Sequence, residues 1–350
     1  MTVDKKYCSS SFLMYRTIVD RNKIFAEGVI PNISEIPQNR IPIHTSNELF
    51  ETLKSKVEDF CRNHKTALCL SGGIDSAILA KFMPKGSVAY TFKYVVPGML
   101  VTDETPQAAK YAKACGLKHR IIEIYWDDFE NFAPVLMQHK GTPIHSIEVQ
   151  IYKAALQAKE EGFDALIFGE SADCLYGGMS NILSRDWTFG EFVDRYTFLK
   201  PYYVLKEYEM DLSPYKIYEK NGYLDVHAWN SHFFYKEGFN SYINACEFAD
   251  MKFCSPYYET FLDVPLDLNR VRSGENKYLV REVFKKLYDN FEIPPKTPMP
   301  RPMNEWLKDW TGSVRDEFWP HCTDNMTGDQ KWLVWSLERF LNLIEANNAN

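Results

Sequence analysis

The strongest chemical signal in the chain is the segment Ser71–Ser76, which reads Ser-Gly-Gly-Ile-Asp-Ser. Its two adjacent glycines allow the backbone to approach a bound anion closely. The hydroxyl groups of Ser71 and Ser76 can donate hydrogen bonds to phosphate oxygens. A bare phosphate would repel the Asp75 carboxylate, so we expect this side chain to hold a Mg²⁺ ion that bridges phosphates. The segment therefore predicts a site for a phosphate chain and its metal ion.

The flanking residues place this segment between a strand and a helix. The apolar run Ala67–Leu70 has the length of a buried strand, and Ile74–Phe82 follows with helical character. A helix directly after the loop points unpaired N–H groups and its positive dipole end at the same spot. A turn that merely caps a helix is the plainer interpretation, but all the fixed positions in a strand-turn-helix context favour the phosphate site.

Strand and helix patterns alternate on both sides of the loop. The helix before it starts at Thr45 and Glu48, which have the spacing of a capping box. Alternation of this kind predicts an α/β fold with a Rossmann-like parallel sheet and ligands at the carboxyl ends of the strands. The expected strands are Ala67–Leu70, Val88–Tyr94, Ile121–Tyr125 and Ala165–Phe168, and the expected helices are Ile74–Phe82, Glu104–Cys115 and Glu148–Lys159.

The ends of the chain look different from this alternating part. Residues 1–44 read as short strands and turns, with strands expected at Phe12–Tyr15 and Lys23–Ala26. Beyond residue 185 the strand signal fades, and long aromatic and charged segments predict mostly helical structure. We therefore expect a short N-terminal segment (1–44) and one large domain (45–350), with its sheet in 45–184 and its helical part in 185–350.

Composition narrows the classes of function. The chain has 350 residues, a formal net charge of -7 and no block of Lys and Arg, which argues against broad binding to nucleic acid. Its eight cysteines form no Cys-x-x-Cys pair, which argues against a zinc ribbon. No signal peptide or membrane-spanning stretch is evident, so we expect a cytoplasmic protein that contacts no membrane.

The pattern S-G-G-x-D-S in Ser71–Ser76 resembles the signature of the PP-loop ATP pyrophosphatase superfamily. This resemblance implies a Rossmann-like fold of the adenine-nucleotide alpha-hydrolase type. It also implies that the β,γ-pyrophosphate of ATP binds at the loop and that ATP is cleaved at its α-phosphate. A substrate oxygen is activated as an adenylate in such enzymes. ATP and Mg²⁺ are therefore the expected cosubstrate and metal.

Further segments resemble the synthetase domain of asparagine synthetases. Asp103–His119 matches a stretch after the second strand, and Gly169–Gly178 resembles G-E-G-x-D-E-x-x-G-G. Ser255–Glu259 lies where that family has V-P-F-L-D, and Lys277–Glu282 matches K-x-x-L-R-E within one residue. The resemblance covers about residues 50 to 310.

The resemblance implies specific roles around the reacting centre. Asp75 and Asp173 would be the Mg²⁺ ligands, and two carboxylates from separate strand ends suit that ion. The backbone of Gly169 would approach the adenylate. Glu170 would take a proton from the amine that attacks the adenylate. The plainer alternatives are a helix cap for Asp173 and a surface ion pair for Glu170.

The resemblance also implies a cation that neutralises the departing pyrophosphate. Lys296 falls within one residue of the family's lysine, and Arg301 is a second candidate for the same task. An exposed loop lysine is an equally good interpretation of Lys296. The residues expected to bind ATP and its pyrophosphate are Leu70, Ser71, Gly72, Gly73, Asp75, Ser76, Phe92 and Gly169.

Several positions depart from the family. Residue 2 is Thr2 instead of a nucleophilic cysteine, and only about 50 residues precede the synthetase-like part, so no glutaminase domain is expected. Free ammonia, a separate glutaminase or an amine on a substrate could each supply nitrogen. Cys254 replaces an arginine, Glu259 an aspartate and Cys174 a glutamate. Without that arginine, free aspartate is a poor candidate for the acceptor.

We therefore expect an ATP-dependent carbon-nitrogen ligase, an asparagine synthetase-like amidotransferase that adenylates a small-molecule carboxylate and transfers an amine or ammonia to it. A sugar acid or a natural-product precursor would suit the aromatic content after residue 185. One alternative is a PP-loop enzyme that modifies tRNA, which commonly carries a basic surface and Cys-x-x-Cys pairs. Another is a nucleotide-binding module without catalytic activity.

Overall fold

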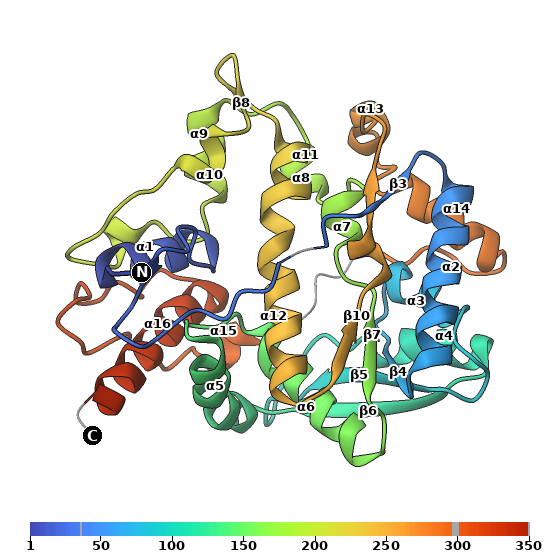
Figure 1. Cartoon of the computed structure of the whole chain (residues 1–350), viewed down its shortest axis with the longest axis horizontal. Helices are drawn as coiled ribbons and strands as arrows, with labels where there is room; N and C mark the ends of the chain where they lie inside the picture. The colour runs from blue at the N-terminus through green and yellow to red at the C-terminus, as the bar shows by residue number, and fades with distance from the viewer. Residues whose placement is uncertain (36, 296–300, 349–350) are drawn as a thin grey trace.

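A computed structural model describes residues 1–35, 37–295 and 301–348 of the chain (Figure 1). A five-stranded sheet forms its centre, and every neighbouring pair of its strands is parallel. The α/β fold with a parallel sheet is therefore confirmed. In spatial order the strands are β10 (Lys252–Cys254), β7 (Ala165–Phe168), β4 (Thr66–Cys69), β5 (Val88–Tyr94) and β6 (Lys118–Ile124).

Side chains of the central strand alternate between two apolar layers. Ala67 and Cys69 pack into one hydrophobic cluster, whereas Leu68 and Leu70 pack into the other. Both faces of the sheet are covered by helices, which is why β4 and β7 are apolar along their whole length. The helices that follow or precede these strands are α2 (Ser46–Asn63), α3 (Ile74–Ala80), α4 (Thr105–Cys115), α5 (Trp126–Lys140) and α6 (Ile147–Glu160).

The predicted elements of this part agree with the structure to within a few residues at their ends. The capping residue Thr45 accepts a hydrogen bond from the Glu48 backbone N–H at 3.2 Å, as the sequence predicts for the start of α2. The Glu48 carboxylate bonds His44 instead of Thr45, so the capping box is only half formed. Helix α5 has no counterpart among the predicted elements.

The N-terminal segment contains a helix where a strand was expected. Helix α1 (Lys5–Tyr15) includes Phe12–Tyr15, so the strand prediction for these residues is wrong. The Asp4 carboxylate accepts a hydrogen bond from the Tyr7 backbone N–H at 2.9 Å and starts the helix, and Arg16 ends it in the left-handed conformation. Nearly every side of α1 is buried, so its apolar residues form a continuous run in the sequence. A continuous apolar run occurs in buried helices and in buried strands, so it does not distinguish the two.

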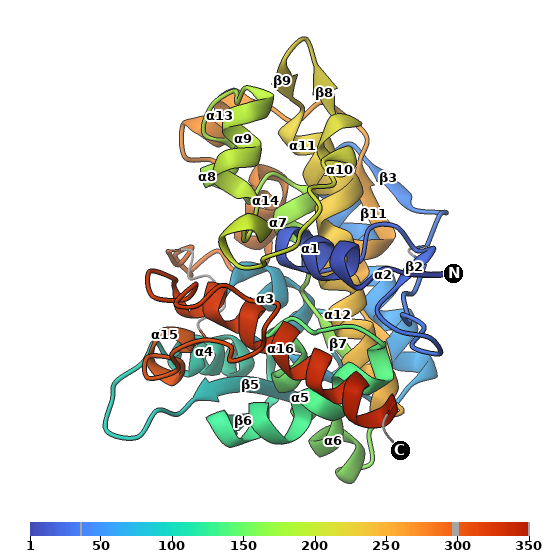
Figure 2. The same ribbon diagram turned by 90° about the vertical axis from the view of Figure 1, so that its left-hand side faces the viewer.

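Short strands tie the rest of this segment to distant parts of the chain. Strand β1 (Thr2–Val3) pairs with β2 (Lys23–Ile24), which falls within the predicted strand at Lys23–Ala26. Strand β3 (Ile41–Ile43) pairs with β11 (Thr260–Leu262). Helix α1 also packs against the C-terminal helix α16 (Gly328–Asn348), as Figure 2 shows.

The second half of the chain is mostly helical, with one correction to the predicted boundary of the sheet. Strand β10 lies in this half and pairs with β7, so the sheet is not confined to residues 45–184. Three residues are too few to show a strand pattern in the sequence. The helices that follow β7 in the chain include α7 (Ala172–Leu175), α11 (Val226–Trp229), a π-helix (Asn230–Phe234), α12 (Tyr235–Phe248), α14 (Tyr278–Leu287) and α15 (Met303–Trp306).

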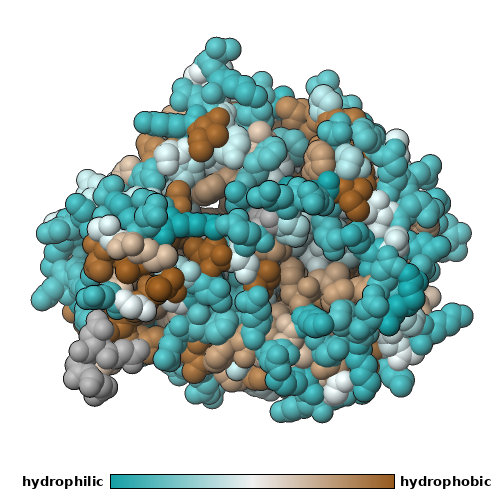
Figure 3. All heavy atoms as spheres, in the orientation of Figure 1, coloured by the Kyte–Doolittle hydropathy of each residue, from teal (hydrophilic) through white to brown (hydrophobic). Residues whose placement is uncertain are grey.

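The surface agrees with the acidic, polar composition. Figure 3 shows hydrophilic side chains over most of one face, with hydrophobic groups gathered in separate small patches. Within the described ranges, no helix is long and apolar enough to cross a lipid bilayer.

Candidate active site

The Ser71–Ser76 loop leaves the carboxyl end of β4 and leads directly into α3. Its two serines hold its shape, because the Ser71 and Ser76 hydroxyl oxygens lie 2.9 Å apart. The Ser71 backbone N–H also donates to the Ser76 hydroxyl at 3.0 Å, and the Gly73 N–H donates to the Ser71 hydroxyl at 3.1 Å. The loop is thus pre-formed as a compact turn at the carboxyl end of the central strand β4.

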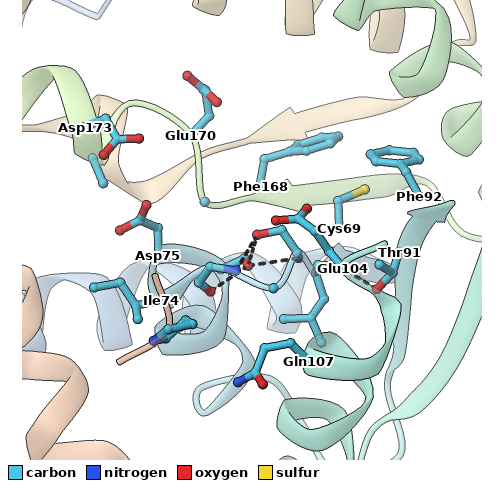
Figure 4. A pocket seen from close by; sticks show the side chains of 18 of the residues that line it. Cys69, Ile74, Asp75, Thr91, Phe92, Glu104, Gln107, Phe168, Glu170 and Asp173 are labelled. Atoms are coloured by element: carbon cyan, nitrogen blue, oxygen red, sulfur yellow. Dashed lines mark hydrogen bonds between the residues drawn. The ribbon is translucent and has the colours of Figure 1, made fainter. Parts of the chain in front are cut away.

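A cavity of about 400 Å³ opens above this loop (Figure 4). The loops after β4, β5 and β7 meet there because Cys69 at the end of β4 pairs with both Tyr90 and Phe168 on the neighbouring strands. The cavity brings together every predicted nucleotide- and metal-binding residue and the predicted base: Leu70, Ser71, Gly72, Gly73, Asp75, Ser76, Phe92, Gly169, Glu170 and Asp173.

The two ends of the cavity differ in character. In Figure 4 the carboxylates of Asp75, Asp173 and Glu170 lie toward one end, whereas the rings of Phe92 and Phe168 lie toward the other. A polar, charged end suits phosphates and a reacting carboxylate, and an apolar end suits a flat base.

Lys277 lies between the two predicted metal ligands. Its ammonium donates to both Asp75 carboxylate oxygens, at 2.7 and 3.0 Å, and lies 2.9 Å from the Asp173 Oδ1. Burial disfavours the charged form of Lys277, but Asp75 and Asp173 outweigh burial and raise its pKa above the usual value. Sequence reasoning did not assign a role to Lys277, although the match of Lys277–Glu282 to the family pattern pointed to it.

The carboxylates of Asp75 and Asp173 both lie against the ammonium nitrogen of Lys277. Their arrangement indicates whether the pair fits a metal ion. Carboxylate oxygens are the ligands that Mg²⁺ prefers, and both carboxylates already face one cation. Among the described residues no cluster of three or more His, Cys, Asp or Glu side chains is placed to hold a metal. The pair therefore fits an ion that takes its remaining ligands from phosphate and water.

Two glycines allow the loops to approach this closely. A Cβ atom on Gly169 would lie 2.6 Å from the Ser76 backbone nitrogen and 2.9 Å from the Asp75 carbonyl carbon. A Cβ on Gly178 would collide with the Asp173 Oδ1 and lie 2.7 Å from the Lys277 Cδ. The loop after β7 can pack against the phosphate loop only because these positions have no side chain.

Glu170 is half-buried beside the long helix α12. The Tyr242 hydroxyl donates to the Glu170 Oε2 at 3.0 Å, and a Cβ on Gly238 would lie 3.4 Å from the Glu170 Oε1. Burial raises the pKa of Glu170 to about 7, against the hydrogen bond from Tyr242, which lowers it. The neighbouring carboxylates Asp173 and Glu237 raise it further. A carboxylate of this kind can hold or release a proton near neutral pH.

A second carboxyl group with a raised pKa lines the cavity at Glu104. Burial raises the pKa of Glu104 to about 7, and Asp103 adds to the effect. The Glu104 Cβ lies 3.3 Å from the position that a Cβ atom added to Gly72 would occupy. The Glu104 side chain therefore lies directly beside the phosphate loop. The sequence indicated Glu104 only as part of a family motif.

The predicted pyrophosphate cations are placed differently. Lys296 lies outside the described residues. Arg301 does not line the nucleotide cavity but lines a smaller hollow, and its guanidinium lies 3.4 Å from the Asp329 carboxylate. The cations that the described structure places on the wall of the nucleotide cavity are Lys277, which immediately precedes α14, and Arg281 in the first turn of that helix.

The parallel sheet and the Ser71–Ser76 loop at its carboxyl edge define a nucleotide-binding protein of the PP-loop class. The family model "Asparagine synthase" matches residues 51–236, which is more than half of the chain. The chain therefore belongs to the asparagine synthase family.

No curated protein sequence matches the chain. Three solved structures show a distant likeness. An NH3-dependent NAD synthetase from Campylobacter jejuni is 15% identical over 39% of this chain, with a TM-score of 0.26, and the alignment spans only 61% of that synthetase. The U34-tRNA thiolase NcsA from Methanococcus maripaludis is 13% identical, covering 71% of this chain and 83% of its own, with a TM-score of 0.28. An NMN synthetase from Francisella tularensis is 12% identical, covering 73% of this chain and 100% of its own, with a TM-score of 0.29.

Proposed function

We propose that the protein is an AMP-forming amide ligase. A carboxylate oxygen of the acid attacks the α-phosphorus of ATP, the bond from that phosphorus to the bridging oxygen breaks, and pyrophosphate leaves. An amine or ammonia then attacks the acyl carbon, loses a proton and displaces AMP, which keeps the former carboxylate oxygen. The observation that carries this proposal is the meeting of a phosphate loop, paired carboxylates with a lysine, and a half-buried glutamate in one cavity.

The phosphate end of the reaction is assigned to the Ser71–Ser76 loop and its neighbours. Asp75 and Asp173 would hold Mg²⁺, which neutralises charge on the phosphates when it is bound. Lys277 lies between these carboxylates and supplies a positive charge for the departing pyrophosphate. Lys296 stays the predicted additional cation from the loop after α14.

The amine end is assigned to Glu170. Its pKa of about 7 leaves a substantial fraction of the carboxylate form at neutral pH, so it can accept the proton that the attacking amine loses. The Tyr242 hydroxyl fixes the direction of the carboxylate through its hydrogen bond to the Glu170 Oε2. Because Glu170 and Asp173 lie on the same loop after β7, the base is held close to the phosphates.

The acceptor is proposed to be an acid other than free aspartate. Cys254 is buried in β10, and Glu259 forms an ion pair with Lys56 of α2, so neither lines the nucleotide cavity. The positions that depart from the family thus supply no arginine to the wall of this cavity. Sugar acids and natural-product precursors remain the proposed class, with ammonia, a separate glutaminase or a substrate amine as the nitrogen source.

Pyrophosphate release with Mg²⁺-ATP and ammonium tests this proposal. The assay uses a panel of aspartate, uronic acids and nucleotide-linked sugar acids, and amide and AMP are measured in the same samples. Release that depends on one acid, with equal amounts of AMP and amide, is the expected result. Formation of ADP in place of AMP, or AMP without amide, would contradict the proposal.

A further inference from the structure

Arg301 lies in a second hollow that adjoins the nucleotide cavity. This hollow has a volume of about 210 Å³, and Leu100, Val101 and Glu305 also line it. Thr102 lines both the hollow and the nucleotide cavity, so the two spaces share a wall. A ligand in the nucleotide cavity therefore has this hollow as neighbouring space.

The positive charge of Arg301 is poorly neutralised for its degree of burial. Its side chain is 12% exposed, and its ion-pair partner in the described part of the chain is Asp329, at 3.4 Å and itself 66% exposed. The Arg301 Nε is buried and finds no hydrogen-bond acceptor among the described residues. Glu305 lines the same hollow, yet no ion pair within 4 Å joins it to Arg301 in the structure as described. A buried guanidinium in this state can bind a further anion without first losing a strong partner.

A second guanidinium, that of Arg16, differs from Arg301 because it has a buried carboxylate partner. The Arg16 Nη2 lies 3.2 Å from the Glu237 Oε2, and its Nη1 lies 2.7 Å from the His145 Nε2. Burial lowers the pKa of Arg16, the Glu237 carboxylate opposes this effect, and the charge of Arg301 adds to the lowering. Glu237 is the only carboxylate within 4 Å of Arg16 in the described ranges.

His145, beside Arg16, is uncharged at neutral pH. Burial, and then the charge of Arg16, lowers the pKa of His145 to about 4. The other buried carboxylate nearby, Glu148, lies 2.5 Å from the Lys140 ammonium and is neutralised by it. The buried carboxylate of Glu237 therefore offsets the charge of Arg16, whereas among the residues that the structure describes Arg301 is offset only by the exposed Asp329.

Helix α12 contacts both Arg16 and Glu170. Glu237 belongs to the Arg16 ion pair, whereas Gly238 and Tyr242 on the same helix contact Glu170. Glu170 and Arg16 thus contact neighbouring residues of α12.

We propose that the acid activated by this enzyme carries a second anionic group, a carboxylate or a phosphate, which Arg301 binds in the hollow beside the nucleotide cavity. This inference rests on the proposed ligase function, because it assumes that an acid binds beside Glu170. Arg301 is then a specificity residue for the acceptor.

Binding of three matched probes to the full-length protein tests the inference without turnover. The probes are glucuronic acid with one anionic group, glucuronic acid 1-phosphate with an added phosphate, and glucaric acid with an added carboxylate. Calorimetry with Mg²⁺ and α,β-methylene-ATP should show at least one of the last two binding about tenfold tighter than glucuronic acid. Which of the two binds tighter distinguishes a phosphate from a carboxylate.

Variants of Arg301 then assign the preference to this residue. Arg301→Gln should remove the tenfold preference, and Arg301→Lys should keep part of it because the charge remains while the planar fork is lost. Arg62→Gln, at a side chain that is 66% exposed, serves as the matched control and should behave as the wild type.

Three results would overturn the inference: equal binding of all three probes to the wild type, no measurable binding of any probe, or an unchanged preference in Arg301→Gln. Failure of the ligase proposal looks different. In that case the Arg301-dependent preference is present, but no acid in the panel yields AMP and an amide.

Discussion

The two sides of the cavity are built in opposite ways. The nucleotide side consists of backbone, glycines and short polar side chains from loops that leave adjacent strands, with Ser71–Ser76 as its main part. The acceptor side consists of polar and charged side chains from distant parts of the chain, with Glu170 hydrogen-bonded to Tyr242 of α12 and Arg16 ion-paired to Glu237 of the same helix. The first arrangement suits a ligand common to a whole superfamily, and the second suits a particular acid.

This difference has a physical basis. Backbone N–H groups and glycines bind any phosphate chain, and their geometry follows from one local turn. Buried charges must be neutralised by partners, and those partners come from distant parts of the chain. Arg16 directly follows α1, His145 lies just before α6, and Glu237 belongs to α12. Substitutions on the two sides should therefore fail in different ways.

The largest effect is expected from Asp75→Ala on the nucleotide side. Loss of this carboxylate removes one proposed metal ligand and one partner of Lys277, so pyrophosphate release should fall about 10³-fold or more. Initial rates with Mg²⁺-ATP and the active acid measure it. Asp309→Ala, at a side chain that is 90% exposed, is the control and should keep full activity. Retained turnover in a folded Asp75→Ala protein would contradict the assignment.

The next effect is expected from Gly169→Ala, which tests the close approach of the two loops. The added methyl group would lie 2.6 Å from the Ser76 nitrogen, so the backbone must shift. We expect a loss of about 1–3 kcal/mol in the free energy of unfolding, together with weaker ATP binding. Denaturant titration and nucleotide binding measure both.

Gly190→Ala provides the contrast for that experiment. Gly190 lies in helix α9 (Phe189–Tyr196), and a Cβ there meets no atom within 4 Å. Alanine at such a position should leave stability unchanged or raise it by up to about 1 kcal/mol. Equal effects of the two substitutions would show that the loops do not pack as described.

On the acceptor side, His145→Gln should change the pH dependence of stability. The pKa of His145 is about 4 in the folded protein, below the value of about 6.5 expected when unfolded. The unfolded chain thus binds more protons between these values, and the wild type loses stability as the pH falls from 6.5 towards 4. His145→Gln should lack this loss, so the difference between the two proteins changes by about 1–3 kcal/mol over that range. The control is His321→Gln, at a side chain that is 83% exposed.

The smallest effect is expected from Tyr242→Phe, which removes one hydrogen bond from the proposed base. Because that hydrogen bond lowers the pKa of Glu170, its loss should raise the pKa. The alkaline-going rise of the pH–rate profile near pH 7 should move to higher pH by less than about one unit. Tyr152→Phe on α6, where the ring packs against Phe132 and Phe248, should leave the profile in place. An unchanged pH–rate profile would show that Glu170 is not the base in the rate-limiting proton transfer.

The same contrast explains what the sequence could predict. The Ser71–Ser76 loop, β5 and β7 depend on contiguous residues, so their patterns predicted their positions. The helix α1 and the strand β10 depend on burial and on a distant partner, and local pattern did not show them.

The residues of the candidate site also differ in whether a local sequence pattern predicts them. Asp75, Gly169 and Asp173 belong to motifs and meet in the cavity as the sequence predicted. The ion pair of Arg16 and Glu237 joins residues more than 200 positions apart, and no local signal marks either of them. Tertiary structure alone brings such charges together, because their partners are fixed by the packing of α1 against the rest of the fold.

The fate of the carboxylate oxygen tests the central claim most directly. The acid from the panel that releases most pyrophosphate is labelled with ¹⁸O in its carboxylate, and the products are examined by mass spectrometry. Adenylation of the acid predicts one ¹⁸O atom in AMP for each amide formed. Unlabelled AMP, or the label in inorganic phosphate, would show that the carboxylate never attacks the α-phosphorus and would contradict the account.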